Sequence, residues 1–400
     1  MKPHLVYIAV IAMLLQQAMS TMSGLTIPVL APSISAEMGL NPGLIGLYTA
    51  ILYGGSMISA LAGGGFLLRF GALRVSQVCL LVVAIGLLIN APGHLLFLVF
   101  GALVIGLGGG PSTPASSQIL ARYAEPTKAP FIFSIKQTGV PVGGVLAGIL
   151  LPVFVTSFGW RGALICAAIM AFALAVALQP LRSEFDADRQ PRRSLRLTDL
   201  RITLSAVLRD GKARLLALGL FAFTGVQLGF ASFFISFLTL GLGWTLTDSG
   251  VAYSISMTSG MFGRLIWGWV GTRHVRPVML LALLGIAMGI ACMGIGLVTP
   301  NWQKAAVWAV AFAYGLTGIG YQGVLLAEIA RVSPPGMAGV VTGGAAFFAY
   351  AGMIVMPASF GLILEVFNSY RLGFLILGSI PIGVGLLFLW SARRIQTAEN

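Results

Sequence analysis

The chain has 400 residues, of which 58% are hydrophobic and only 9% are charged, and its mean hydropathy is +0.95. This composition excludes a water-soluble globular protein, because too little polar surface is available to face water. The formal net charge of +13 is typical of nucleic-acid binders, but here the basic residues form short clusters between apolar runs. We therefore expect no nucleic-acid partner, and we interpret the charge as a determinant of membrane topology.

Apolar segments long enough to cross a membrane follow one another along almost the whole chain. A spanning helix needs roughly 20 mostly apolar residues, and charged residues, prolines and glycines separate twelve such segments. We expect an all-α membrane protein with twelve transmembrane helices in two pseudo-symmetric six-helix bundles. The approximate limits of the spans are 5–30, 44–67, 75–93, 95–120, 131–155, 161–180, 214–240, 249–270, 277–298, 305–330, 337–363 and 372–391.

The basic residues predict the orientation of these spans. If both termini are cytoplasmic, Arg161, Lys304 and Arg371 face outward, and Lys136 and Arg264 lie within spans. The other nineteen of the 24 Lys and Arg residues then face the cytoplasm, as the positive-inside rule requires. We therefore expect a multi-pass protein of the cell inner membrane, solvated by its lipids, with cytoplasmic termini.

A charged segment divides the chain into two halves. Residues 181–213 are rich in Arg, Asp and Glu and include an amphipathic stretch from Leu197 to Lys212, which predicts a helix lying on the cytoplasmic leaflet. The predicted domains are an amino-terminal six-helix bundle, 1–180, this cytoplasmic linker, 181–213, and a carboxy-terminal six-helix bundle, 214–400.

Short motifs recur in the two halves at a nearly constant offset of 204 to 210 residues. Gly43 and Gly250 correspond, each following a predicted helix cap, Asn41 or Asp248. The other matching pairs are Gly64 and Gly268, Arg69 and Arg273, Gly106 and Gly315, Arg122 and Arg331, Trp160 and Tyr370, and Arg161 and Arg371. Parallel six-helix repeats of this kind are one known transporter design, with the substrate held near the membrane midplane.

The loop after the second span carries the most specific motif. Residues 64–74 read Gly-Gly-Phe-Leu-Leu-Arg-Phe-Gly-Ala-Leu-Arg, with Gly64, Arg69 and Gly71 at the defining positions. This loop resembles the Gly-x-x-x-Asp-Arg-x-Gly-Arg signature of the major facilitator superfamily, and the resemblance covers essentially the whole chain. It implies two bundles around a central cavity that transport by alternating access.

The sequence departs from the family pattern at three positions. Leu68 and Thr272 stand where the family usually has Asp, so we expect its charge-relay latch to be weakened or rebuilt from other residues. Ala102 replaces an Arg of helix 4 that is often linked to proton coupling. Residues 136–144 are a degenerate form of the helix-5 motif of drug antiporters.

Three charged residues fall inside spans, where charges are costly and are therefore functional candidates. In the family, helices 5 and 8 pack together, which implies that Lys136 and Arg264 approach each other beside the cavity and bind an anion. Arg264 also begins a segment that resembles helix 8 of monocarboxylate and oxalate/formate porters. Alternatively, Lys136 extends to the cytoplasmic interface or Arg264 is structural. For Glu328 we favour an ion pair with Arg331, or with Arg122, over proton carriage.

Uncharged polar residues near the middle of spans complete the candidate substrate site. Gln17 and Gln227 match at an offset of 210, so they can hydrogen-bond a ligand from both halves. Tyr53, Tyr321, Gln322 and Tyr350 are candidate lining residues, and ordinary helix packing is the alternative for each.

The residue pattern favours transport over catalysis. The chain has no Walker motif, we expect no cofactor or catalytic residue, and we interpret Cys79, Cys166 and Cys292 as packing residues rather than metal ligands. We therefore predict a monomeric secondary transporter of a small organic anion, a mono- or dicarboxylate, with protons as a possible coupling ion. The alternatives are a multidrug efflux antiporter of the same fold and a membrane sensor or scaffold without transport.

Overall fold

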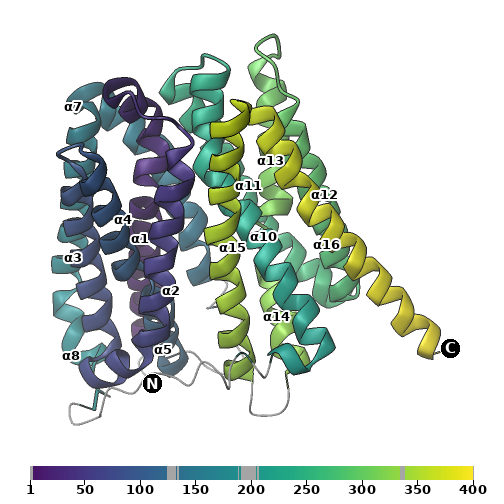
Figure 1. The fold of residues 1–400 in the computed structure, drawn as a ribbon. Helices are drawn as coiled ribbons and strands as arrows, with labels where there is room; N and C mark the ends of the chain where they lie inside the picture. Colours follow the sequence, from purple (N-terminus) through teal and green to yellow (C-terminus); the bar gives the residue numbers. More distant parts are fainter. Residues whose placement is uncertain are drawn as a thin grey trace. The chain divides into compact units, whose positions relative to one another are not determined.

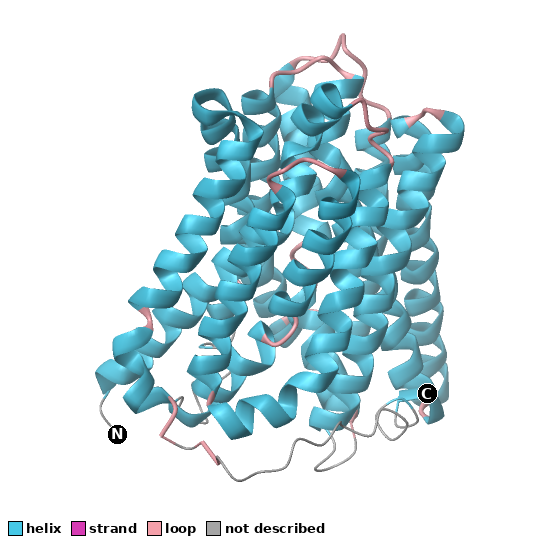
Figure 2. Ribbon diagram, turned by 60° about the vertical axis from the view of Figure 1, so that its left-hand side comes forward, coloured by secondary structure: helices cyan, strands magenta, loops and turns pink. Residues whose placement is uncertain are grey.

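The computed structural model describes residues 3–123, 132, 135–187, 189–190, 204, 207–333 and 338–399, and all regular elements in these ranges are helical. Helices run along most of the chain and are joined by short loops (Figures 1 and 2). The elements of the first half are α1 (Pro3–Met38), α2 (Leu44–Phe70), α3 (Ala72–Asn90), α4 (Leu95–Gly109), α5 (Ser112–Tyr123), α7 (Gly139–Ala177), η1 (Gln179–Leu181) and α8 (Arg182–Phe185). Those of the second half are α10 (Gly211–Ser236), η2 (Phe237–Gly241), α11 (Leu246–Arg273), α12 (Pro277–Gly296), α13 (Lys304–Gly318), α14 (Gln322–Val332), α15 (Ala338–Phe367) and α16 (Tyr370–Glu399).

The described helices account for twelve membrane crossings. Ten segments are long and apolar enough to span a bilayer. One of them contains α7, which is two helices joined at Gly159, where the backbone is not helical (φ 69°, ψ 172°). Helix α11, with 28 residues but many Ser and Thr side chains, adds the twelfth crossing. The predicted all-α fold of twelve membrane helices is therefore confirmed.

The packing separates the chain into two compact units. The first unit comprises residues 1–40 and 51–198, and the second comprises residues 41–50 and 199–400. The domain boundaries predicted around residues 181–213 stay a prediction. Most of the predicted amphipathic helix from Leu197 to Lys212 lies outside the described residues.

The fourth span of each half is interrupted at the same place. Helix α4 ends at Gly109 and α5 begins at Ser112 after Pro111, whose missing N–H and fixed φ disfavour a continuous helix. In the second unit, α13 ends at Gly318 and α14 begins at Gln322. The break at Pro111 and its counterpart show that the sequence repeat is also a structural repeat.

Glycines allow these interrupted helices to approach their neighbours closely. A Cβ on Gly106 would collide with the backbone carbonyl of Leu52, and a Cβ on Gly315 would collide with that of Ser256. Each glycine therefore sets the distance between its helix and a neighbouring helix of the same unit, α2 in the first and α11 in the second.

Two sequence-based details are wrong. The first helix runs to Met38 rather than to residue 30, since Pro28 and Pro32 are accommodated within it. Asp248 is not the cap of α11, because Thr245 precedes it and its hydroxyl accepts a hydrogen bond from the backbone N–H of Asp248 at 3.1 Å. The carboxylate of Asp248 instead forms an ion pair with Lys304 at 2.7 Å.

Candidate substrate-binding residues and the family signature

Lys136 lies in a polar cluster of the first unit. Its side chain is only 1% exposed, and its ammonium group donates hydrogen bonds to Oε1 of Gln17, at 3.0 Å, and Oε1 of Gln137, at 3.3 Å. The hydroxyl of Thr113, from the start of α5, donates to the same Gln17 oxygen at 3.3 Å. The amide oxygens accept from the ammonium group and fix its position.

Gln16 extends this cluster and was missed by the sequence analysis. Its Nε2 donates to the hydroxyls of Ser112, at 2.8 Å, and Ser20, at 3.2 Å. The Gln16 side chain is fully buried, and within the described residues its Oε1 accepts no hydrogen bond. The adjacent glutamines in α1 and the Ser-Thr pair directly after Pro111 were the signals that a polar cluster forms here.

Arg264 lies in a polar cluster of the second unit. It lies half-buried on α11, and its Nη2 donates to Oε1 of Gln322 at 2.8 Å, while its Nε donates to the carbonyl of Ile319 at 3.3 Å. Both acceptors flank the break between α13 and α14. Because carbonyl groups at a helix end lack intrahelical partners, the break supplies an acceptor that a continuous helix would not.

Tyr321 connects the same break to α10. Its fully buried hydroxyl lies 3.0 Å from Oγ1 of Thr224 and 3.3 Å from Oε1 of Gln227. Tyr321 and Gln322 therefore tie the break to α10 and α11, respectively. The structure brings together four of the predicted residues of this unit, Arg264, Gln322, Tyr321 and Gln227, although their binding role stays a prediction.

Tyr53 and Tyr350 lie half-buried on α2 and α15, respectively. Both tyrosines lie within membrane-spanning helices, as the sequence predicted. Their part in a substrate site stays a prediction.

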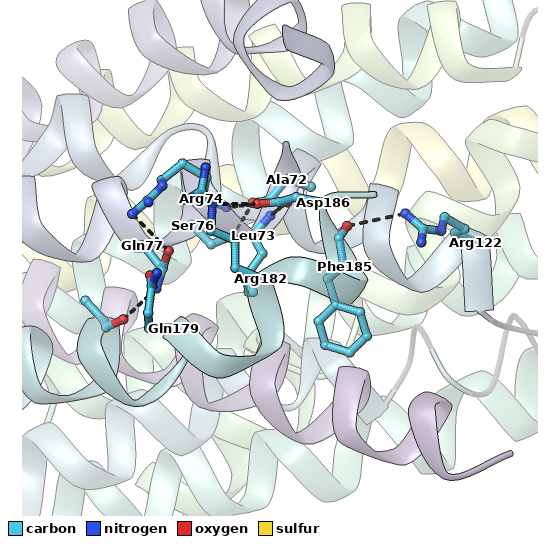
Figure 3. Close-up of polar contacts among 11 residues, drawn as sticks. Ala72, Leu73, Arg74, Ser76, Gln77, Arg122, Gln179, Arg182, Phe185 and Asp186 are labelled. Atoms are coloured by element: carbon cyan, nitrogen blue, oxygen red, sulfur yellow. Dashed lines mark hydrogen bonds and ion pairs between the residues drawn. The ribbon is translucent and has the colours of Figure 1, made fainter. Parts of the chain in front are cut away.

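The signature loop is closed by a carboxylate that is distant in sequence (Figure 3). Asp186, directly after α8, accepts hydrogen bonds from the backbone N–H groups of Leu73, at 2.7 Å, and Arg74, at 3.0 Å, at the start of α3. Gly71 has a φ of 96°, and a Cβ there would collide with the Asp186 carboxyl group. The carboxylate satisfies free N–H groups of a helix start and opposes its partial positive charge. Asp186 thus supplies a carboxylate contact at the start of α3, and the expected change of the latch at Leu68 and Thr272 stays a prediction.

Arg122 holds the same short helix from another side. Its Nη2 donates to the carbonyl of Glu184 and to the hydroxyl of Tyr123, both at 2.9 Å, and its Nη1 lies 3.4 Å from the carbonyl of Phe185. Figure 3 shows Arg122 and Asp186 on either side of Phe185. Arg122 is therefore a structural contact of α8 in the first unit.

Glu328 and Arg331 form a bidentate ion pair on α14. The Arg331 Nε and Nη2 atoms lie 2.7 and 2.6 Å from the two carboxylate oxygens. The Glu328 side chain is 1% exposed and that of Arg331 is 67% exposed. The predicted i, i+3 pair is thus present, and the structural rather than proton-carrying role of Glu328 stays a prediction.

The remaining signature positions lie on helices. Gly64 and Arg69 are on α2, and the Arg69 guanidinium stands 5.4 Å from the centre of the Phe70 ring. Gly268 and Arg273 are on α11, where Gly268 faces open space and Arg273 is exposed at the last turn. Their gating role stays a prediction.

Among the described residues, no group of three or more His, Cys, Asp or Glu side chains is arranged to hold a metal ion. Cys79 and Cys292 are buried free thiols, and Cys166 is a half-buried one. They lie on three different helices, α3, α7 and α12.

Comparison with known proteins identifies the family. The sequence profile of the Major Facilitator Superfamily matches residues 10–357. The chain belongs to this superfamily. It is therefore a multi-pass membrane protein of a transporter family, and the resemblance found in the signature loop is confirmed.

Three similar proteins illustrate the relationship. The hexuronate transporter of Bacillus subtilis is 23% identical over 388 residues, which cover 91% of this chain and 89% of the relative. Monocarboxylate transporter 11 of Mus musculus is 23% identical over 84% of this chain and 76% of its own length. The crystal structure of a bacterial homologue of the human lysosomal transporter Spinster, inward-facing and occupied, shares the fold, with a TM-score of 0.72, 16% identity and 98% coverage of both chains.

Proposed function

We propose that this protein is a secondary transporter, and not an enzyme, that moves a small organic anion bearing a carboxylate across the cell inner membrane by alternating access. Arg264 binds the anionic group and Lys136 adds positive charge. Gln17, Gln227, Tyr53, Tyr321, Gln322 and Tyr350 contribute polar contacts and shape. The protein acts as a monomer with cytoplasmic termini, and a proton gradient is the proposed energy source.

The observation that carries this proposal is a cation positioned by glutamine in each unit. Lys136 is bonded to Gln17, and Arg264 is bonded to Gln322. A charged side chain inside a membrane span is expensive and is typically retained for function. The guanidinium group offers a planar set of donors that can bind a carboxylate through two parallel hydrogen bonds, and an ammonium group adds a compact charge.

The substrate class is supported by the relatives. Hexuronates and monocarboxylates, named for two similar transporters, are carboxylate anions. The shared chemistry is a carboxylate rather than one carbon skeleton, so we assign the class and not a single compound.

The motif at residues 136–144 does not favour the drug-exporter alternative. Gly139 and Gly143 face α1, where a Cβ on either would collide with the backbone carbonyl of Leu14 or Ala18. Close packing of two helices of the first unit therefore accounts for these glycines without a role in drug export.

A binding screen tests the proposal. The purified protein is heated with glucuronate, lactate, malonate, glucose or a cationic dye, since a ligand that binds only the native state raises the melting temperature. We expect at least one carboxylate to raise it by roughly a degree or more at saturation, and glucose and the dye to leave it unchanged. Stabilisation by the cationic dye alone would contradict the anion proposal and favour the exporter alternative.

A further inference from the structure

A groove of about 870 Å³ opens on the first unit, apart from the polar cluster around Lys136. Its walls come from α2, α3, α4, α8 and the segment that follows α8. It is apolar along most of its length, and four arginines, Arg69, Arg74, Arg182 and Arg189, line it as well. In Figure 1, the α8 end of the first unit is also the end at which the amino terminus lies.

The apolar walls of the groove face outward. Ile58 is 58% exposed, Phe66 is 42% exposed and Val78 is 47% exposed. All three belong to membrane-spanning helices, in which exposed apolar side chains meet lipid chains rather than water. The groove therefore has the lining that a hydrocarbon chain prefers.

The positive charge of the arginines exceeds the negative charge described beside them. Asp186 is a described carboxylate next to α8, and its oxygens accept the N–H groups of Leu73 and Arg74. The Arg182 Nε forms an ion pair with the Asp186 carboxylate at 3.8 Å, so this carboxylate offsets part of the charge of the four arginines. The carboxylate of Glu184 contacts the hydroxyl of Tyr123 instead, at 3.3 Å.

The described side-chain contacts of Arg74 and Arg69 are with neutral groups. The Arg74 Nη1 lies 3.4 Å from Oε1 of Gln77, and Arg69 stands over the Phe70 ring. Guanidinium groups bind phosphate oxygens through paired, charge-assisted hydrogen bonds. Four of them in one groove form a basic site at a membrane-spanning unit, and such sites suit anionic lipid headgroups.

We infer that this groove binds one anionic phospholipid, with its phosphate among Arg69, Arg74, Arg182 and Arg189 and an acyl chain along Ile58, Phe66 and Val78. A free phosphate would use only the basic end and leave the apolar walls empty. A zwitterionic lipid would bring a positive headgroup to a site that is already positive. Charge and lining together therefore select an anionic lipid.

The test measures lipid retention by native mass spectrometry of the full-length protein. The protein is equilibrated with equal amounts of phosphatidylglycerol and phosphatidylcholine of identical acyl chains. We expect the wild type to retain one phosphatidylglycerol at least about tenfold more than phosphatidylcholine. The double variant Arg182→Gln/Arg189→Gln should retain roughly tenfold less phosphatidylglycerol than the wild type. Each basic residue contributes on the order of a kilocalorie per mole to anionic lipid binding.

Two further variants make the test specific. Arg209→Gln/Arg214→Gln removes the same charge from exposed positions at the start of α10, outside the groove, and should retain the lipid like the wild type. Val78→Trp fills the apolar wall without changing charge and should weaken retention. All variants are compared at equal elution profile and melting temperature, so that a loss of lipid is not a loss of fold.

Three results would overturn the inference. Equal retention of the two lipids would show an apolar groove without headgroup recognition. Unchanged phosphatidylglycerol retention in Arg182→Gln/Arg189→Gln would remove the arginines from the site. Displacement of the lipid by millimolar glycerol phosphate, with Val78→Trp behaving as the wild type, would assign the site to a free phosphate.

Discussion

At the scale of single residues, the charged side chains inside the spans have different kinds of described contact. Lys136 and Arg264 donate to glutamine oxygens, whereas Glu328 is paired with Arg331. A neutral oxygen positions a cation without cancelling its charge, and an ion pair largely cancels both charges. The first arrangement suits a site that binds an anion, and the second suits a structural contact.

The shape of the guanidinium group should matter at position 264. Arg264→Lys keeps the charge but loses the paired donors, so we expect weaker binding of the carboxylate found in the screen. Arg264→Ala should weaken it by thirtyfold or more, since truncating a buried charged contact costs roughly 2–5 kcal/mol. Lys136→Ala should have a smaller effect. Isothermal titration calorimetry of the wild type and the three variants checks this order of affinities. Equal affinity of Arg264→Ala and the wild type would contradict the prediction.

The pair of Glu328 and Arg331 should respond asymmetrically to truncation. Arg331→Gln leaves a buried carboxylate without its cation, which should lower the free energy of unfolding by about 3–5 kcal/mol. Glu328→Gln leaves an arginine that can turn toward water, because its side chain is 67% exposed, and should cost less. We expect a larger fall in melting temperature for Arg331→Gln and unchanged proton-driven uptake in Glu328→Gln. Loss of that uptake with intact substrate exchange would make Glu328 the proton carrier.

At the scale of helices, the two interrupted spans follow from short signals in the sequence. Pro111 accounts for the break between α4 and α5, and the match of Gly106 with Gly315 relates this break to its counterpart between α13 and α14. The partners created by these breaks were harder to predict. Arg264 bonds to Ile319 and Gln322, which are 55 and 58 residues away, and Asp186 closes a loop 113 residues earlier. Such contacts depend on how helices pack, and helical periodicity does not encode that.

The close approach of helices predicts which glycines are essential. Gly106→Ala and Gly315→Ala would press a methyl group against the carbonyl of Leu52 or Ser256, so both should lower the melting temperature and the yield of monodisperse protein. Gly323→Ala is the matched control, because nothing lies within 4 Å of a Cβ there, and it should be neutral or slightly stabilising. A destabilised Gly323→Ala with an unaffected Gly106→Ala would contradict this account of the packing.

At the scale of the whole molecule, composition and repeats predicted the fold class, since it depends on patterns spread over hundreds of residues, and the resemblance of residues 64–74 to a known signature indicated the family. The substrate depends on a few side chains, and the sequence predicted only part of their surroundings. Gln17 and Gln227 were singled out by their repeat offset and Arg264 by the cost of a charge inside a span. The contacts of Gln16, Thr113 and Ile319 became clear only from the fold. Every residue has a backbone carbonyl, so the identity of Ile319 does not reveal that its carbonyl accepts from Arg264.

The orientation of the chain is a prediction that can be checked directly. In a variant without Cys79, Cys166 and Cys292, a cysteine at Ser194 should resist an impermeant thiol reagent added outside intact cells. A cysteine at Ser157, exposed beside the turn at Gly159, should react. The positive-inside distribution of basic residues is the physical reason. Reaction at position 194 with protection at position 157 would invert the proposed topology.

Transport of a carboxylate that depends on Arg264 is the central claim, and uptake into proteoliposomes tests it most directly. Labelled glucuronate and lactate are offered to vesicles containing the wild type, Arg264→Ala or no protein, with an inward proton gradient and with trapped unlabelled substrate. We predict that the wild type accumulates at least one of the two and that Arg264→Ala, at equal incorporation, stays at the level of empty vesicles. Near-native accumulation by a well-folded Arg264→Ala protein would contradict the account.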